Sequence, residues 1–115
     1  MKYVYVPKGE FLYKEGDFEN LLFYGIIKGE IIIKKNKSLE EKINGIVCNK
    51  GLFVEIELMT ASDGYCFGEI SLIYNTPRTA SVYANTDLHL FSIDQNAFNL
   101  SFHVNIIFII IIKIL

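Results

Sequence analysis

Short runs of β-branched and aromatic residues, separated by glycine-containing turns, fill most of this 115-residue chain. Such runs are typical of partly buried strands, and glycine permits the tight turns between them. A chain of this length has room for one hydrophobic core. We therefore predict a mainly β domain, a jelly roll or squat β-barrel of about eight strands with helical additions. The strands are expected at Lys2–Val6, Glu10–Lys14, Leu21–Ile27, Glu30–Lys34, Ile43–Cys48, Leu52–Met59, Ala80–Asn85 and Leu88–Ile93.

The middle of the chain is expected to form a loop followed by a hairpin. Residues 36–42 are polar and charged, which predicts an exposed loop, and the Asn-Lys-Gly sequence at 49–51 predicts the hairpin turn. In the strand that follows, Glu55 and Glu57 alternate with aliphatic residues. Because successive side chains of a strand point to opposite faces, we expect the carboxylates in solvent and the aliphatic side chains inside.

Residues 67–81, Phe-Gly-Glu-Ile-Ser-Leu-Ile-Tyr-Asn-Thr-Pro-Arg-Thr-Ala-Ser, predict a short helix, a proline turn and an arginine. Gly68 lets a ligand approach its backbone closely, and the amides at 69–71 are the unpaired donors of a helix N-terminus, which suit an anion. Arg78 adds a planar charged fork that fits two phosphate oxygens. Glu69 suits an anion site only if the ligand also carries hydroxyl groups. A phosphate and a ribose hydroxyl on one molecule satisfy both residues, which indicates a nucleotide.

This segment resembles the phosphate-binding cassette of cyclic nucleotide-binding domains, as in cyclic-nucleotide-dependent protein kinases, gated channels and catabolite-activator-type regulators. The family pattern is Phe-Gly-Glu, a small residue, Leu, and then Pro-Arg, Thr or Ala, and Ala. It is matched here by Phe67, Gly68, Glu69, Ser71, Leu72, Pro77, Arg78, Thr79 and Ala80. The turns at Gly9, Gly16 and Gly29 are also similar to those of the family, so the resemblance covers about Val4 to Phe98.

The resemblance implies cyclic GMP (cGMP) or cyclic AMP (cAMP) as the ligand and a role for each cassette residue. Arg78 would be the counter-ion of the cyclic phosphate, and Glu69 would accept the ribose 2′-hydroxyl. Backbone amides would bind the phosphate oxygens, and the backbone of Gly68 would face the ribose. The implied ligand-binding residues are Gly68, Glu69, Ile70, Ser71, Arg78, Thr79 and Ala80.

Base selectivity is expected to depend on Thr79. Family members with Ala after the arginine typically select cAMP, whereas members with Thr or Ser often bind cGMP well, so Thr79 implies a cGMP or dual binder. Alternatively, the hydroxyl bonds only its own turn. By strand position, Val82, Ile56 and Leu58 either line an apolar pocket for the base or belong to the ordinary core.

One domain is predicted, at residues 1–98, followed by an apolar tail at 99–115 that is truncated or atypical for the family. Asp94 is a suitable N-cap for a helix that begins near Gln95. The isoleucine-rich run of about ten residues near the C-terminus is shorter than the ~20 residues that a membrane-spanning helix needs.

Composition argues against several functional classes. The net charge of −2 gives no broad basic field for nucleic acid. His89 and His103 do not form a ligand-spaced cluster, so no metal is expected. We find no nucleophile with a base, no phosphate loop and no kinase signature, and therefore predict no enzyme and no cofactor. Cys48 and Cys66 are expected as free thiols of a reducing, cytoplasmic compartment, and no secretory signal opens the chain.

We therefore predict a regulatory sensor module that binds a cyclic nucleotide, with a protein kinase catalytic domain as a candidate partner. The alternative is a barrel that keeps the fold, binds no nucleotide and serves as a docking module. A DNA-binding regulator would need a helix-turn-helix after the barrel, and no segment after Phe98 resembles one.

Overall fold

The computed structural model describes residues 1–43 and 45–101. Within them the chain forms eight strands and two helices, so the mainly β prediction is confirmed. In chain order these are β1 (Lys2–Val6), β2 (Phe11–Tyr13), β3 (Phe23–Lys28), β4 (Ile31–Ile43), β5 (Ile46–Ala61), β6 (Cys66–Phe67), α1 (Glu69–Tyr74), β7 (Ser81–Ala84), β8 (Leu88–Ile93) and α2 (Gln95–Ser101).

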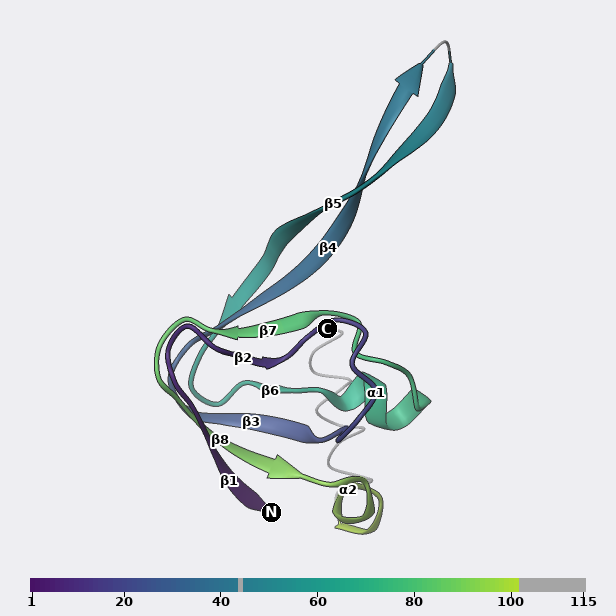
Figure 1. Ribbon diagram of the computed structural model, residues 1–115. Coiled ribbons are helices and arrows are strands. Elements are labelled where there is room, and N and C mark those ends of the chain that lie inside the picture. Colours follow the sequence, from purple (N-terminus) through teal and green to yellow (C-terminus); the bar gives the residue numbers. More distant parts are fainter. Residues whose placement is uncertain (44, 102–115) are drawn as a thin grey trace.

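The strands form two four-stranded sheets of antiparallel pairs, in the orders β1-β8-β3-β6 and β2-β7-β4-β5. Figure 1 shows the short strands gathered into one body, with α1 beside β6 and α2 following β8. Neighbours in a sheet come from distant parts of the sequence; β1 pairs with β8, for example, from Lys2 opposite Ser92 to Val6 opposite Leu88. This arrangement is the predicted jelly roll.

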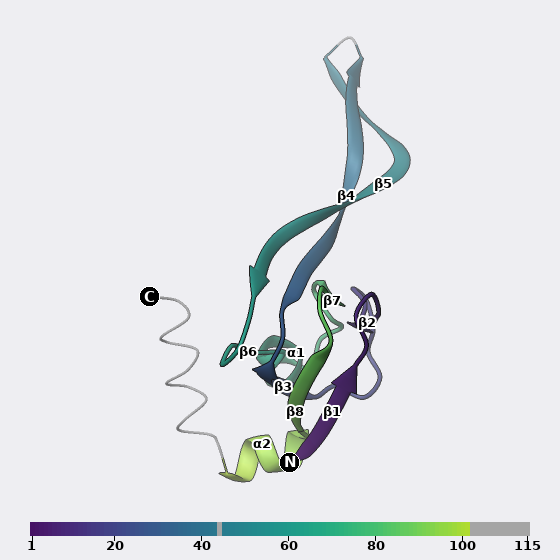
Figure 2. The same ribbon diagram turned by 90° about the vertical axis from the view of Figure 1, so that its left-hand side faces the viewer.

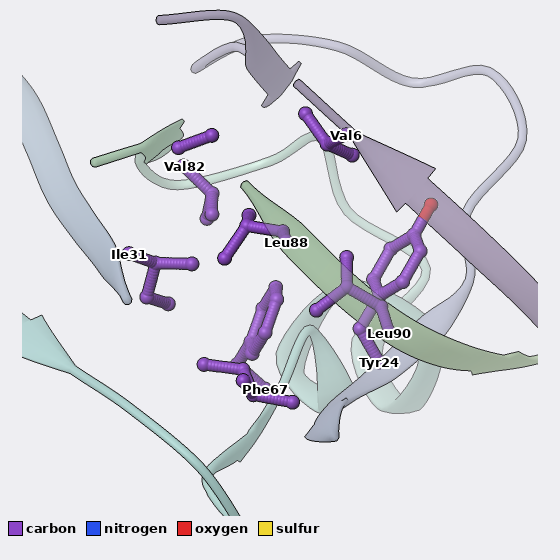
Figure 3. Close-up of a cluster of buried hydrophobic side chains, with 9 residues drawn as sticks. Val6, Tyr24, Ile31, Phe67, Val82, Leu88 and Leu90 are labelled. Carbon is purple, nitrogen blue, oxygen red and sulfur yellow. The ribbon is translucent and has the colours of Figure 1, made fainter. Parts of the chain in front are cut away.

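The core lies between the two sheets. Leu88 and Leu90 of β8 and Ile31 of β4 are fully buried, and aromatic rings from β3 and β6 pack beside them. Figure 3 shows these side chains pointing toward one another: Val6, Tyr24, Ile31, Phe67, Val82, Leu88 and Leu90. Burial of apolar area from all these strands is the main force that holds the sheets together.

A smaller apolar cluster anchors both helices to the same sheet. Leu72 of α1 and Phe98 of α2 pack with Phe23 and Ile93, which pair with each other at the end of β3 and β8. Asp94 is the N-cap of α2 as predicted, since its Oδ1 accepts a hydrogen bond of 2.8 Å from the Ala97 amide. The predicted tail from residue 102 onward lies outside the described residues.

The hairpin β4–β5 is much longer than predicted. β4 has 13 residues and β5 has 16, and Figures 1 and 2 show them projecting from the body as a twisted two-stranded ribbon. The predicted loop at 36–42 is wrong, because those residues lie within β4 and pair with β5. Cross-strand hydrogen bonds satisfy this polar backbone, so a strand can form here without an apolar sequence pattern.

The predicted turn at 49–51 is also wrong, because β5 passes through those residues without a break. The chain reverses instead between Ile43 and Ile46, which are paired, and Gly45 there has φ +81°. The sequence at the reversal is Asn44-Gly45, the dipeptide that most strongly favours a two-residue hairpin loop.

The expected inward orientation of the β5 aliphatic residues is wrong as well. Val54, Ile56 and Leu58 are 42%, 37% and 52% exposed. They alternate with Glu55 and Glu57 as predicted, but this part of β5 lies beyond the barrel. Neither of its faces therefore meets a core.

Candidate functional site

The cassette segment surrounds a pocket of about 130 Å³ at the N-terminal end of α1. Three parts of the fold meet there: the β6–α1 junction, the segment that enters β7, and single residues of β2 and β4. Its lining consists of Tyr13, Ile33, Tyr65, Phe67, Gly68, Glu69, Ile70, Ser71, Arg78, Thr79, Ala80 and Val82. Residues far apart in the sequence thus provide polar groups on one side and apolar side chains on the other.

Gly68 is the N-cap of α1 and has φ +93°, a conformation that side-chain-bearing residues rarely adopt. A Cβ atom at this position would lie 2.9 Å from the Leu22 carbonyl oxygen and 3.0 Å from Arg78 Nη1. Both contacts are too close, so glycine is required for space as well as for conformation. Gly68 has no side chain that could cap α1, so it accepts no side-chain hydrogen bond from the first-turn amides of the helix.

Arg78 lies in the wall of the pocket and is only 4% exposed. Its Nη1 donates to the Gly68 carbonyl at 3.1 Å and its Nη2 to the Leu22 carbonyl at 2.7 Å. The guanidinium carbon lies 4.0 Å from the centre of the Tyr13 ring and 5.9 Å from that of Tyr24. The contacts that hold this permanent positive charge are therefore two carbonyl oxygens and aromatic faces.

The backbone of Arg78 is fixed as firmly as its side chain. Its amide donates to the Asp17 carbonyl and its carbonyl accepts from the Gly16 amide, both at 2.8 Å. These two bonds tie the segment before β7 to the turn after β2. The position of Arg78 thus depends on contacts formed far from it in the sequence.

Two tyrosines, Tyr13 and Tyr65, belong to the pocket lining. Burial raises the pKa of Tyr13; Arg78 lowers it and the Glu69 carboxylate raises it. The pKa of Tyr65 is also raised, first by burial and then by Glu69. Since both pKa values lie above the ordinary value for tyrosine, both side chains stay neutral at neutral pH.

Eight of the ten predicted site residues line this pocket: Gly68, Glu69, Ile70, Ser71, Arg78, Thr79, Ala80 and Val82. Arg78 and Ser71 are buried, whereas Thr79 and Ile70 are exposed on the solvent side. Val82 is buried and belongs to the core as well. The structure brings these residues together, and their role in binding stays a prediction.

The other two predicted residues, Ile56 and Leu58, are not part of the pocket lining. They lie on the exposed half of β5, beyond the barrel. The lining of the pocket contains Ile33 of β4 instead, together with Tyr13 and Tyr65. Tyr13 and Ile33 reach the pocket through strand pairing, since both lie opposite Val82, and the sequence did not mark them. Tyr65 lies three residues before Gly68, just outside the predicted segment.

A second, larger pocket of about 610 Å³ lies next to the first. The turn between β2 and β3 forms most of its lining, from Gly16 to Asn20. Tyr13 and Arg78 line both pockets, so the stacked pair stands between them.

Two further features bear on the kind of site. Within residues 1–43 and 45–101, no three His, Cys, Asp or Glu side chains gather in a group that could hold a metal ion. Of the helices in that part of the chain, none is long and apolar enough to cross a membrane. The pocket therefore offers a buried guanidinium, helix-terminal amides, a carboxylate and an apolar wall, a set that fits a small ligand with both an anionic and a hydroxyl group.

Comparison with known proteins finds the same fold in structures that contain a bound cyclic nucleotide. Residues 58–102 match the family model of the cyclic nucleotide-binding domain. A structure of PfPKA-R with cAMP bound is 33% identical over 85% of this chain and 30% of its own length, with a TM-score of 0.67. The EAL enzyme Bd1971 in its cGMP-bound form is 28% identical over 83% of this chain and 22% of its own, with a TM-score of 0.64.

The catabolite activator protein of Thermus thermophilus is similar in fold, with a TM-score of 0.72. It is 20% identical over 89% of this chain and 41% of its own. This chain thus spans less than a third of the length of the PfPKA-R and Bd1971 chains.

Proposed function

Because this chain carries a domain of the cyclic nucleotide-binding family, we propose that it binds a cyclic nucleotide in the pocket at α1 and acts as a regulatory sensor. The cyclic phosphate would lie between the Arg78 guanidinium and the amides of Ile70 and Ser71. The ribose 2′-hydroxyl would donate to Glu69, and the base would lie toward Val82. Domain limits of 1–98, with a separate tail at 99–115, are part of this proposal.

The observation that carries the proposal is the buried charge of Arg78. A guanidinium cannot lose its proton at physiological pH, and a buried charge without an opposite charge is unfavourable. The contacts that hold it are the Gly68 and Leu22 carbonyls and the aromatic faces, which solvate the charge without neutralising it. An anionic ligand would place a negative charge beside this buried guanidinium, which suits phosphate recognition.

Thr79 supports cGMP as a ligand beside cAMP. Its side chain is exposed on the edge of the pocket, after Arg78 and before Ala80. In this position the hydroxyl would be available to the exocyclic amino group of guanine.

Regulation requires a partner or segment that distinguishes the bound from the free state. A protein kinase catalytic domain is the partner we propose, since the similar PfPKA-R structure is named for such a kinase and holds cAMP. We also propose that the domain itself does not catalyse a reaction and that the protein is located in the cytoplasm.

Titration calorimetry of the full chain tests the proposal. We expect binding of cGMP or cAMP at about micromolar affinity or tighter, and much weaker binding of guanosine, which lacks the phosphate. Circular dichroism of the same sample establishes that the protein is folded. A folded sample that gives no heat with either cyclic nucleotide at millimolar concentration would contradict nucleotide binding and support a docking module instead.

The phosphate contact is tested by Arg78→Ala and Arg78→Lys. We expect Arg78→Ala to weaken binding by about 2–4 kcal/mol, because a charge-assisted contact in a partly buried site is lost. Arg78→Lys keeps the charge without the planar fork and should fall between this variant and the wild type. Since the Arg78 side chain also bonds Leu22 and Gly68, the urea midpoint of each variant is the control. A loss of less than tenfold in a folded Arg78→Ala protein would show that the phosphate is bound elsewhere.

Base reading is tested by Thr79→Ala. If the hydroxyl contacts guanine, this variant should shift the ratio of cGMP to cAMP affinity toward cAMP by about tenfold, the scale of one hydrogen bond. Calorimetry with both ligands measures the ratio. An unchanged ratio means that Thr79 does not read the base.

A further inference from the structure

Arg78 is the only arginine in the chain, and its guanidinium carbon lies over the ring of Tyr13. The guanidinium carbon lies 4.0 Å from the ring centre, within the range of a favourable cation–π contact. The two hydrogen bonds to Leu22 and Gly68 use one donor from each terminal nitrogen. A guanidinium has five N–H donors, so these two bonds do not use its full capacity to donate.

We propose that Tyr13 is a positioning residue that fixes the orientation of the Arg78 guanidinium before the ligand arrives; this inference rests on the proposed binding of a cyclic nucleotide. The two carbonyl oxygens bind the ends of the guanidinium, and the ring of Tyr13 contacts its central carbon, which lies 4.0 Å from the ring centre. A long, flexible arginine side chain is thereby held in one geometry, so that little conformational freedom is lost when phosphate binds.

Tyr13 is itself held firmly enough for this role. Its ring packs against the rings of Tyr24 and Phe67, with centroid distances of 6.1 and 6.3 Å. Its backbone pairs with Val82 in β7, four residues after Arg78. The ring thus lies on β2, and the guanidinium belongs to the segment that enters the paired strand β7, whose backbone is also bonded to Gly16 and Asp17 after β2.

The contact depends on the aromatic ring and not on the hydroxyl group. Tyr13→Phe keeps the ring and should therefore keep the position of Arg78, whereas Tyr13→Leu removes the ring face. Phe11→Leu is the matched control, because Phe11 lies on the same strand and its ring packs edge-on against Tyr83, 5.2 Å away. Phe11 is absent from the lining of the pocket.

Calorimetry with cGMP and cAMP on the full-length variants gives the first readout. We expect Tyr13→Leu to bind the better ligand about tenfold more weakly, and Tyr13→Phe and Phe11→Leu to stay within about threefold of wild type. Should Tyr13→Leu fail to fold, Tyr13→Met provides the same contrast. Equal affinities of wild type and the folded ring-less variant would overturn the positioning role.

Nuclear magnetic resonance of the ligand-free protein gives the second readout, and it does not depend on nucleotide binding. Because Arg78 is the only arginine, its Nε–H group gives a single signal, which the Tyr13 ring current should displace from the position typical of exposed arginine. We expect this displacement in wild type, Tyr13→Phe and Phe11→Leu and its loss in Tyr13→Leu. An undisplaced signal in wild type would overturn the inference. A displaced signal in a wild-type protein that binds no cyclic nucleotide would contradict the proposed function while leaving the Tyr13–Arg78 contact established.

Discussion

The inner and outer parts of the β4–β5 hairpin differ in what holds them. From Ile31 to Lys34, β4 is paired with β5 on one side and β7 on the other, and Ile31 is fully buried. Beyond Lys34, β4 pairs with β5 alone, and the aliphatic side chains of β5 from Val54 to Leu58 are exposed. The same two strands therefore belong to a packed barrel at one end and to an isolated ribbon at the other (Figure 2).

This difference shows that strand pairing and core formation are separate requirements. Burial of a side chain such as Ile31 contributes roughly 1.5–3 kcal/mol, and many such contributions stabilise the barrel. The outer ribbon depends on cross-strand hydrogen bonds and side-chain pairs, which alone make a two-stranded hairpin marginally stable. We therefore expect the ribbon to open locally without unfolding of the barrel.

The largest effect is expected from a core truncation in the barrel. Leu90→Ala removes a fully buried side chain of β8 and should lower the free energy of unfolding by about 3 kcal/mol, through lost burial and the cavity left behind. Ile56→Ala on the outer ribbon is the matched variant and should change it by less than about 1 kcal/mol, because the side chain is already exposed. Urea denaturation followed by circular dichroism measures both. Equal losses of unfolding free energy in the two variants would mean that the Ile56 side chain is buried in solution.

A smaller effect is expected from Gly68→Ala in the cassette. We expect a loss of about 1–3 kcal/mol in unfolding free energy, because an alanine at φ +93° is strained and its Cβ would clash with the Leu22 carbonyl and Arg78. Ligand affinity should fall with it, since Arg78 would be displaced. Gly64→Ala is the control, because Gly64 has φ +86° but no atom within 4 Å of an added Cβ. If the two variants lose the same stability and neither loses affinity, the close approach at Gly68 has no role in the site.

The same contrast explains which parts of the molecule the sequence predicts. The jelly roll and the strand at Leu88–Ile93 follow from apolar runs that are buried in the structure. The cassette is local in sequence, so its residues from Gly68 to Ala80 could be assigned to one pocket. Tyr13 could not be assigned to the pocket from the sequence, because it reaches Arg78 through the pairing of β2 with β7. In the ribbon, polar residues 36–42 form a strand, and the alternation around Ile56 does not mark an inner face, because Val54, Ile56 and Leu58 are exposed.

The smallest effect is expected from removal of the outer ribbon. Residues 39–52 can be replaced by Asn-Gly, which would join Ser38 to Phe53, a pair already opposite each other in β4 and β5, by a favoured two-residue turn. The free energy of unfolding should change by less than about 1 kcal/mol, because the strand pairs in this segment join it only to itself and the pairing of β4 with β7 ends at Lys34. Affinity for cyclic nucleotide should stay within about twofold, since the part of β4 in the pocket wall is Ile33, inside the barrel. If the shortened protein folds but binds more than about tenfold more weakly, a loss of more than 1.4 kcal/mol in binding free energy, the ribbon contacts the bound ligand. The ribbon would then belong to the site and not be an independent extension of the barrel.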